Sequence, residues 1–141
     1  MKDVKDYTVR HDALTAEEFL LLWESVWGGA PSLEQTRLAM EHSLHRVSVY
    51  DGDTPIAMAR MIGDRGLCCY IKDVVVRPAY QGQGLGRLLV ETLLTFVREN
   101  GVPGTEVFVE LCAMPDKMPF YAQFGFDTNE AQRMKRMVKV D

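Results

Sequence analysis

The 141-residue sequence predicts an α/β (α+β) fold with the element order β-α-α-β-β-β-α-β-α-β. Segments in which apolar and polar residues alternate, typical of strands, are interspersed with segments whose apolar residues recur every three or four positions, typical of helices. The strand pattern at 67–76 leads through a glycine-rich stretch directly into a long helix pattern at 85–100. At this length we expect one domain over residues 1–141.

The N-terminal elements begin with a short strand at 7–10. Thr15-Ala-Glu-Glu18 has the form of a capping box, so we expect a helix that begins there and ends near Val26. Ser32-Leu-Glu-Gln35 repeats the signal and predicts a second helix to about Ser43. These two helices follow one another without an intervening strand.

Three consecutive strands are predicted next. Residues 47–51 alternate, and Asp51-Gly52 is typical of a tight hairpin turn that leads into a returning strand at 56–62. A second turn, at 63–66, leads into the strand at 67–76. We therefore expect an antiparallel meander in the middle of the chain.

The long helix predicted at 85–100 carries a stripe of leucines and Phe96, and Asn100-Gly101 ends it. A strand is predicted at 105–112 and a short helix at 115–124. The last strand, at 132–140, has basic residues interleaved with Met and Val, which favours an exposed edge strand.

Composition excludes several classes of protein. The net charge is −4 with scattered basic residues, which argues against a nucleic-acid partner, and no apolar run approaches the length of a membrane span. The N-terminus has no hydrophobic signal region, so we expect a cytoplasmic protein. Cys68, Cys69 and Cys112 lack a metal-ligand spacing, so we expect reduced thiols and no metal site.

The glycine-rich stretch 81–87 is the strongest functional signal. A helix N-terminus offers free N–H groups and a partial positive charge, and glycines let the backbone close around a phosphate. Gly82, Gly84 and Gly86 alternate, and Arg87 stands where either a Rossmann or a Walker motif needs another glycine. The loop therefore predicts a phosphate site of another kind, or else a tight strand-to-helix connection.

Gln81, Gly84 and Gly86 fit the pattern Q-x-x-G-x-G, and residues 119–126 fit F-Y-x-x-x-G-F. With these two motifs the chain resembles the GNAT superfamily of N-acetyltransferases. The resemblance is specific over residues 71–126 and rests on element order elsewhere. It implies a central mixed sheet whose strands splay apart, with helices on both faces.

The resemblance further implies acetyl-CoA as co-substrate. Where the strands splay, the backbone of Val74, Val75 and Val76 would bind the pantetheine arm like an added strand. Three valines also fit a strand that is buried on both faces. The pyrophosphate would be held by the loop residues, which are Gln81, Gly82, Gln83, Gly84, Leu85, Gly86 and Arg87.

Acyl transfer from a thioester to an amine requires a neutral amine, a stabilised oxyanion and a protonated leaving thiolate. By resemblance, Tyr121 is the general acid that protonates the thiolate. We expect Asp73 to act as the base, with Glu110 as the alternative and Tyr70 as a member of a water chain. The Asn that many relatives carry before their F-Y motif is missing from residues 113–119.

These features predict an acetyl-CoA-dependent N-acetyltransferase that acts on a primary amine of a small molecule by direct attack in a ternary complex. Alternative acceptors are an aminosugar phosphate or a protein amine. A non-catalytic acyl-CoA-binding regulatory domain and an unrelated phosphate-binding module are the rival classes. The acceptor wall, or else plain core, is expected at Trp23, Trp27, Met58, Met61, Tyr70 and Met114.

Two expectations concern residues outside these motifs. The last strand, 132–140, is a candidate for homodimer formation. His11, His42 and His45 lie outside every motif, and we expect them at the surface or at helix ends.

Overall fold

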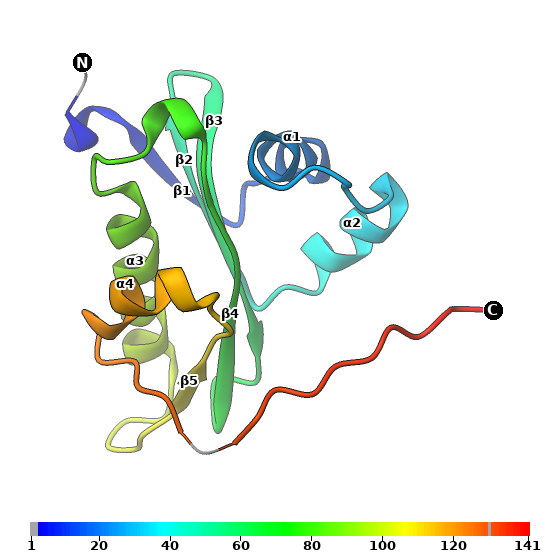
Figure 1. Ribbon diagram of the computed structural model, residues 1–141. Coiled ribbons are helices and arrows are strands. Elements are labelled where there is room, and N and C mark those ends of the chain that lie inside the picture. Colours follow the sequence, from blue (N-terminus) through cyan, green and yellow to red (C-terminus); the bar gives the residue numbers. More distant parts are fainter. Residues whose placement is uncertain (1–2, 130) are drawn as a thin grey trace. The chain divides into compact units, whose positions relative to one another are not determined.

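The computed structural model describes residues 3–129 and 131–141. The chain divides into two compact units, one ending at Leu111 and one beginning at Cys112, and each is described by itself. The first unit contains a five-stranded sheet in the order β1-β2-β3-β4-β5 (Figure 1). Its strands are β1 (Thr8–His11), β2 (His45–Asp51), β3 (Thr54–Gly63), β4 (Cys68–Val76) and β5 (Phe108–Glu110).

The sheet is mixed, as expected. Strands β1 to β4 pair antiparallel, whereas β5 pairs parallel to β4. The helices of this unit are α1 (Ala16–Val26), α2 (Leu33–Glu41) and α3 (Leu85–Asn100), with 3-10 turns η1 (Val4–Asp6) and η2 (Pro78–Tyr80). In Figure 1, α1 and α2 lie on one face of the sheet and α3 on the other.

Local sequence signals explain where the first two helices begin. The Thr15 side chain accepts a hydrogen bond from Glu18 N, and the Glu18 side chain accepts one from Thr15 N, which completes the predicted capping box. Ser32 and Gln35 do the same for α2. Both boxes satisfy N–H groups that a helix leaves without a partner.

The core forms on both faces of the sheet. On one face, Phe19 and Leu22 of α1 pack in a cluster with Met58 of β3 and Val75 of β4. On the other, α3 presents a buried stripe of Leu85, Leu89, Val90 and Leu93. Both faces of the central strands are therefore covered, which explains the many apolar residues of β3 and β4.

Strand β4 is irregular at its centre. Arg60 of β3 opposes Lys72, but Met58 opposes Val75, so β4 carries one residue more than β3 across this stretch. Asp73 lies in this bulge with φ +55°, a left-handed conformation that is uncommon for a non-glycine residue. The bulge turns the second half of β4 and fixes the direction of the Asp73 side chain.

The sheet also splays, as the resemblance implies. Strand β5 pairs with β4 only at Cys68, Cys69 and Tyr70. Beyond that point β4 continues to Val76, where its ladder is with β3 alone. Among the described residues, no strand pairs with the other edge of β4 over its second half.

The second unit holds a 3-10 turn, η3 (Pro115–Lys117), and a short helix, α4 (Met118–Ala122), in place of one predicted helix at 115–124. The sixth strand predicted at 132–140 is wrong for the described residues, since 131–141 form no strand and their side chains are exposed. Alternation alone does not make a strand, because a strand requires a partner for its backbone.

The strand predicted at 105–112 is likewise reduced to Phe108–Glu110. Within the residues that the structure describes, no helix is long and apolar enough to cross a membrane.

Candidate functional site

The loop between β4 and α3 has the backbone form of an anion cradle. Gly82 and Gly84 adopt φ +83° and +90°, values that side-chain-bearing residues rarely take. A Cβ built at either glycine would meet no atom within 4 Å, so the space beside them is open. The glycines are therefore required by backbone conformation and leave room for a ligand to approach the main chain.

The N-terminus of α3 faces this cradle without a side-chain cap. Gly84 is the N-cap residue, and the first intrahelical bond runs from Leu88 N to Gly84 O at 3.0 Å. The preceding amides of the first turn have no acceptor within the helix, and they lie at the positive end of a 16-residue helix dipole. This arrangement attracts an anion such as a phosphate.

Three hydrogen bonds hold the loop in place. Tyr7 Oη donates to Gln83 Oε1 at 3.2 Å, and Tyr80 Oη donates to Asp51 Oδ2 at 2.9 Å. The Gln81 side-chain amide donates to Val76 O at 3.0 Å, which ties the loop to the end of β4. The Gln81 amide has a second N–H, so this bond leaves one donor of the side chain to spare.

The two arginines near the loop already have partners. Arg87 Nη1 lies 3.1 Å from Glu91 Oε1 within α3, and Arg77 Nε donates to Pro55 O at 2.7 Å. Arg87 is exposed, so its pair with Glu91 is weakly held and its guanidinium can turn toward an anion. The hydrogen bond from Arg77 to Pro55 O holds the residue that precedes the loop in place.

Strand β4 supplies the second part of the site. The Val75 side chain is buried in the core, while Val74 and Val76 are half-buried. The side chains therefore anchor the strand, and the backbone edge that faces away from β3 has no ladder partner. An extended ligand with amide groups can hydrogen-bond to such an edge.

Asp73 precedes this edge and is held by an ion pair. Its Oδ2 lies 2.6 Å from Arg60 Nε, and Arg60 Nη1 also reaches Ser43 Oγ at 3.4 Å. The two charged side chains are only 16% and 10% exposed, so both charges are largely desolvated. No local pattern of residues indicates this pair, because Arg60 reaches Asp73 only through the register of β3 and β4.

Glu110 lies on β5 directly opposite Tyr70 of β4. Its Oε2 is 3.6 Å from the Cys68 sulfur. Burial, followed by the neighbouring Glu110 carboxylate, raises the pKa of the Cys68 thiol. Cys68, Cys69 and Cys112 are free cysteines in the structure.

Tyr121 belongs to α4 in the second unit. It is half-buried, and its ring makes edge contacts with Phe120 at 5.0 Å and with Phe126 at 6.2 Å between centroids. Burial raises the pKa of the Tyr121 phenol. The group is therefore protonated at neutral pH and can donate a proton.

The residues expected at the acceptor wall separate into two groups. Met58 and Met61 are fully buried, so they belong to the core, which was the alternative reading of these residues. Trp27 is 50% exposed and packs edge-on against Trp23 at 4.8 Å. Trp23 Nε1 donates to Gly28 O at 3.0 Å, which fixes its ring.

Comparison with known proteins places the chain among acetyltransferases. The profile of the Acetyltransferase (GNAT) family matches residues 12–126. Serotonin N-acetyltransferase 2, chloroplastic, of Oryza sativa subsp. japonica is 36% identical over 97 residues, which cover 66% of this chain and 46% of that protein. The chain thus spans less than half the length of this relative.

Two further relatives match over more of their length. An uncharacterised N-acetyltransferase of Porphyra purpurea is 30% identical over 130 residues, covering 89% of this chain and 71% of that protein. A crystal structure from meticillin-resistant Staphylococcus aureus, of a protein of unknown function described as a probable acetyltransferase, has a TM-score of 0.82 at 29% identity. The structural match covers 95% of this chain and 99% of the Staphylococcus aureus chain. The chain belongs to the acetyltransferase (GNAT) family.

Proposed function

We propose that this protein is an acetyl-CoA-dependent N-acetyltransferase that acetylates a primary amine of a small molecule. The observation that carries the proposal is the conjunction of two features in one segment. The backbone edge of β4 lacks a strand partner, and it leads within a few residues into the glycine cradle at the N-terminus of α3. An extended amide chain that ends in a pyrophosphate matches both features.

Acetyl-CoA fits the residues present. The pyrophosphate would be held by amides of the loop, from Gln81 through Gly82, Gln83, Gly84, Leu85 and Gly86 to Arg87. Val74, Val75 and Val76 would supply the backbone groups that bind the pantetheine amides. The hydrogen bonds of Tyr7 to Gln83 and of Gln81 to Val76 support the fit, because they hold loop and strand in one conformation before the ligand arrives.

The proposed reaction is direct attack in a ternary complex. The neutral amine nitrogen forms a bond to the thioester carbonyl carbon, and the oxyanion is stabilised by a backbone N–H of β4 near Val75. Collapse of this intermediate breaks the C–S bond. The amine loses one proton to a base, and the leaving thiolate gains one from the Tyr121 phenol.

Asp73 is the base that we propose, and Glu110 is the alternative. Arg60 occupies one oxygen of the Asp73 carboxylate, so the other oxygen would accept the proton directly or through a water. Glu110 would require a water chain in which Tyr70 takes part. Variants of the two carboxylates distinguish these routes.

For the acceptor we propose an amine with an aromatic or apolar body. The name of the rice relative, a serotonin N-acetyltransferase, and the exposed Trp27 ring beside Trp23 support this class. Helix α1, which carries Trp23 and ends at its C-cap residue Trp27, packs on β3 and β4. Aminosugar phosphates and protein amines are the competing acceptors.

Calorimetry and turnover together test the proposal. We expect acetyl-CoA to bind to the purified protein more tightly than ADP, and coenzyme A to be released when aralkylamines are added. Tight binding of acetyl-CoA without turnover of any amine would favour a regulatory domain. Equal affinity for ADP and coenzyme A would overturn the proposal that the β4 edge binds the pantetheine arm.

Three expectations from the sequence stay predictions. These are a single functional domain over residues 1–141, a cytoplasmic location and a homodimer. Sedimentation that finds only the 16.0 kDa species would exclude the dimer.

A further inference from the structure

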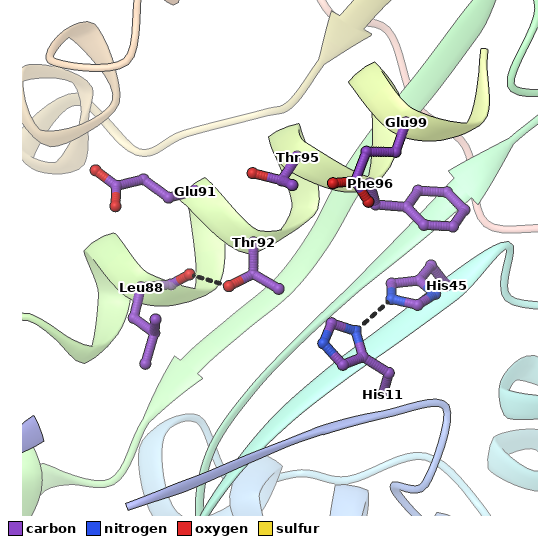
Figure 2. A pocket seen from close by; sticks show the side chains of 8 residues that line it. All are labelled: His11, His45, Leu88, Glu91, Thr92, Thr95, Phe96 and Glu99. Atoms are coloured by element: carbon purple, nitrogen blue, oxygen red, sulfur yellow. Dashed lines mark hydrogen bonds between the residues drawn. The ribbon is translucent and has the colours of Figure 1, made fainter. Parts of the chain in front are cut away.

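A cavity of about 500 Å³ opens on the first unit between α3 and the β1–β2 pair. Figure 2 shows His11 opposite Thr92 of α3, and His45 opposite Phe96. No residue of the cradle 81–87 lines this cavity. It is therefore distinct from the site of the proposed reaction.

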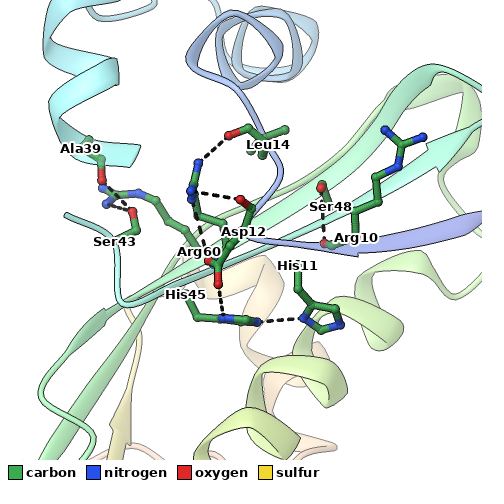
Figure 3. A network of polar contacts seen from close by, with 10 residues as sticks. Arg10, His11, Asp12, Leu14, Ala39, Ser43, His45, Ser48 and Arg60 are labelled. Carbon is green, nitrogen blue, oxygen red and sulfur yellow. Dashed lines mark hydrogen bonds and ion pairs between the residues drawn. The ribbon is translucent and has the colours of Figure 1, made fainter. Parts of the chain in front are cut away.

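Two histidines and an aspartate form a hydrogen-bonded chain at its wall (Figure 3). His45 Nδ1 lies 3.1 Å from Asp12 Oδ2, and a carboxylate oxygen can only accept, so His45 carries its proton on Nδ1. In the neutral ring the Nε2 atom is then an acceptor. His11 Nδ1, 2.8 Å away, must be its donor.

The consequence is a fixed tautomer for His11. A neutral imidazole that carries its proton on Nδ1 has a bare lone pair on Nε2. His11 is exposed and lines the cavity, so it offers a hydrogen-bond acceptor there. The chain Asp12–His45–His11 orients this acceptor, much as a carboxylate orients an imidazole in a catalytic triad.

The surrounding fold holds the chain rigidly. His45 is 7% exposed, and its ring stacks on Phe96 at 4.2 Å with an interplanar angle of 12°. Asp12 has φ +51° and its Oδ1 accepts from Arg46 N at 2.9 Å. The expectation that His45 lies at the surface is wrong, since Phe96 of α3 stacks on its ring.

The charge of the lining selects the ligand. Glu91 and Glu99 of α3 contribute carboxylates, Thr95 lies between them, and Leu88 and Phe96 are apolar. Among the described lining residues there is no lysine or arginine, and the arginine beside them, Arg87, pairs with Glu91 at the exposed surface. Carboxylates and a bare imidazole nitrogen accept hydrogen bonds from a cation and repel an anion.

We propose that this cavity is a binding site for an aliphatic diammonium ion, separate from the acceptor amine of the transfer reaction. One ammonium group donates to His11 Nε2 and to the Glu99 carboxylate. The alkyl chain lies on Leu88 and Phe96. The second ammonium group reaches Glu91 and displaces the exposed guanidinium of Arg87, which lies 3.1 Å from it. Eight residues of helix separate the two glutamates, a distance of about 12 Å, which a linear diamine can span.

A bound metal ion explains these residues less well. The described part of the chain has no group of three or more His, Cys, Asp or Glu side chains that could hold one. His45 has both ring nitrogens occupied by hydrogen bonds, so His11 alone has a nitrogen to offer. An organic cation requires only the acceptors already present.

Titration of the full chain with 1,8-diaminooctane, in the absence of acetyl-CoA, tests the site. The histidine side-chain NMR resonances report on it, because the diamine donates to His11 and perturbs His45 through the chain. We expect saturable shifts of the His11 and His45 signals and none for His42. The dicarboxylate glutarate should produce no shift.

Glu99→Gln should raise the dissociation constant about three- to tenfold, since it replaces a charged acceptor by a neutral amide oxygen. Glu99 is exposed, so this variant keeps the fold. Glu106→Gln makes the same charge change outside the cavity and is the matched control. His11→Phe, with His42→Phe as its control, should abolish the shifts of His45.

An unchanged affinity in Glu99→Gln, or equal losses in Glu99→Gln and Glu106→Gln, would overturn the proposal. Shifts of His11 and His45 that vanish when acetyl-CoA is added would also overturn it, because the diamine would then bind in the coenzyme A site or be consumed as an acceptor. The proposed diammonium site does not depend on turnover, so it would stand even if the protein acetylated no amine. The diammonium site and the proposed acetyltransferase activity are therefore tested independently.

Discussion

Arg60 Nε lies 2.6 Å from Asp73 Oδ2, across a bulge in β4 where Asp73 adopts φ +55°. Both side chains are largely buried, so the pair carries two desolvated charges next to the free edge of β4. The Asp73 carboxylate thus has two separate roles to test, as the ion-pair partner of Arg60 and as the proposed catalytic base. Removing each partner in turn separates the two roles.

Asp73→Asn is expected to lower kcat strongly and to destabilise the fold by about 3 kcal/mol, because it leaves the Arg60 guanidinium without a counterion. Arg60→Met should destabilise the fold comparably. The double variant Arg60→Met/Asp73→Asn should recover much of the stability. Urea unfolding and steady-state kinetics on the three variants measure both effects.

The double variant decides the role of Asp73. If Asp73 accepts the proton, activity stays low although stability returns. If activity returns with stability, Asp73 only supports the bulge, and the same assay on Glu110→Gln tests the alternative base. A loss of activity in Glu110→Gln with a normal rate in the double variant would transfer the role to Glu110.

Gly84→Ala is expected to weaken acetyl-CoA binding about tenfold or more. A Cβ at φ +90° strains the N-cap and displaces amides that would hold a charged phosphate, each worth about 1.5–3 kcal/mol. Gly52→Ala is the matched control, because Gly52 also has a positive φ, +61°, in a turn between β2 and β3. Calorimetry should find a loss of affinity in the first variant only.

Comparable affinities in Gly84→Ala and the wild-type protein would argue that the loop does not bind the pyrophosphate. Thermal unfolding of Gly84→Ala and Gly52→Ala measures the backbone strain in each variant. Each should lose about 1–2 kcal/mol of stability, because alanine is unfavourable in a left-handed conformation.

Much of the fold could be predicted because its signals are local. The capping boxes at Thr15 and Ser32 mark helix starts within four residues of sequence, and the helix at 85–100 has the predicted bounds. The family was recognisable for the same reason, since the glycine loop is contiguous. Such features depend on residues that are neighbours in the chain.

What could not be predicted depends on pairing between distant residues. The register of β3 and β4 brings Arg60 to Asp73, and the pairing of β1 with β2 brings His11 to His45. Residues 132–140 have the alternating pattern of a strand, but in the described part of the chain no strand pairs with them. The strand predicted there was therefore wrong. Alternation describes one strand, whereas a ladder requires two.

Tyr121→Phe is expected to reduce kcat by about 10²–10⁴-fold with little change in the affinity for acetyl-CoA, since it removes the proposed proton donor and keeps the ring. Burial raises the pKa of Tyr121, so the donor form persists to the alkaline end of the assay range. Single-turnover kinetics and calorimetry separate the two parameters.

Tyr50→Phe provides a control for the loss of a phenol. Tyr50 Oη donates to Glu18 Oε1 at 2.9 Å in the core of the first unit, so its loss should lower stability by about 1 kcal/mol and leave kcat unchanged. A Tyr121→Phe variant with the kcat of the wild-type protein would remove Tyr121 from the mechanism.

The stability of the fold should depend on pH through His45. Burial lowers the pKa of His45, and His11 lowers it further, while the Asp12 carboxylate opposes both without reversing the direction. Since the folded-state pKa lies below the unfolded value of about 6.5, the unfolded chain binds more protons in the window between them. The free energy of unfolding therefore rises with pH across that window. The contribution of His45 is complete above pH of about 6.5 and is lost as the pH falls toward the folded-state pKa.

Urea unfolding of wild-type protein and of His45→Gln between pH 5 and 7.5 measures this slope, with His42→Gln as the control. The slope should flatten in His45→Gln alone, and a slope unchanged in that variant would assign the pH dependence to another group.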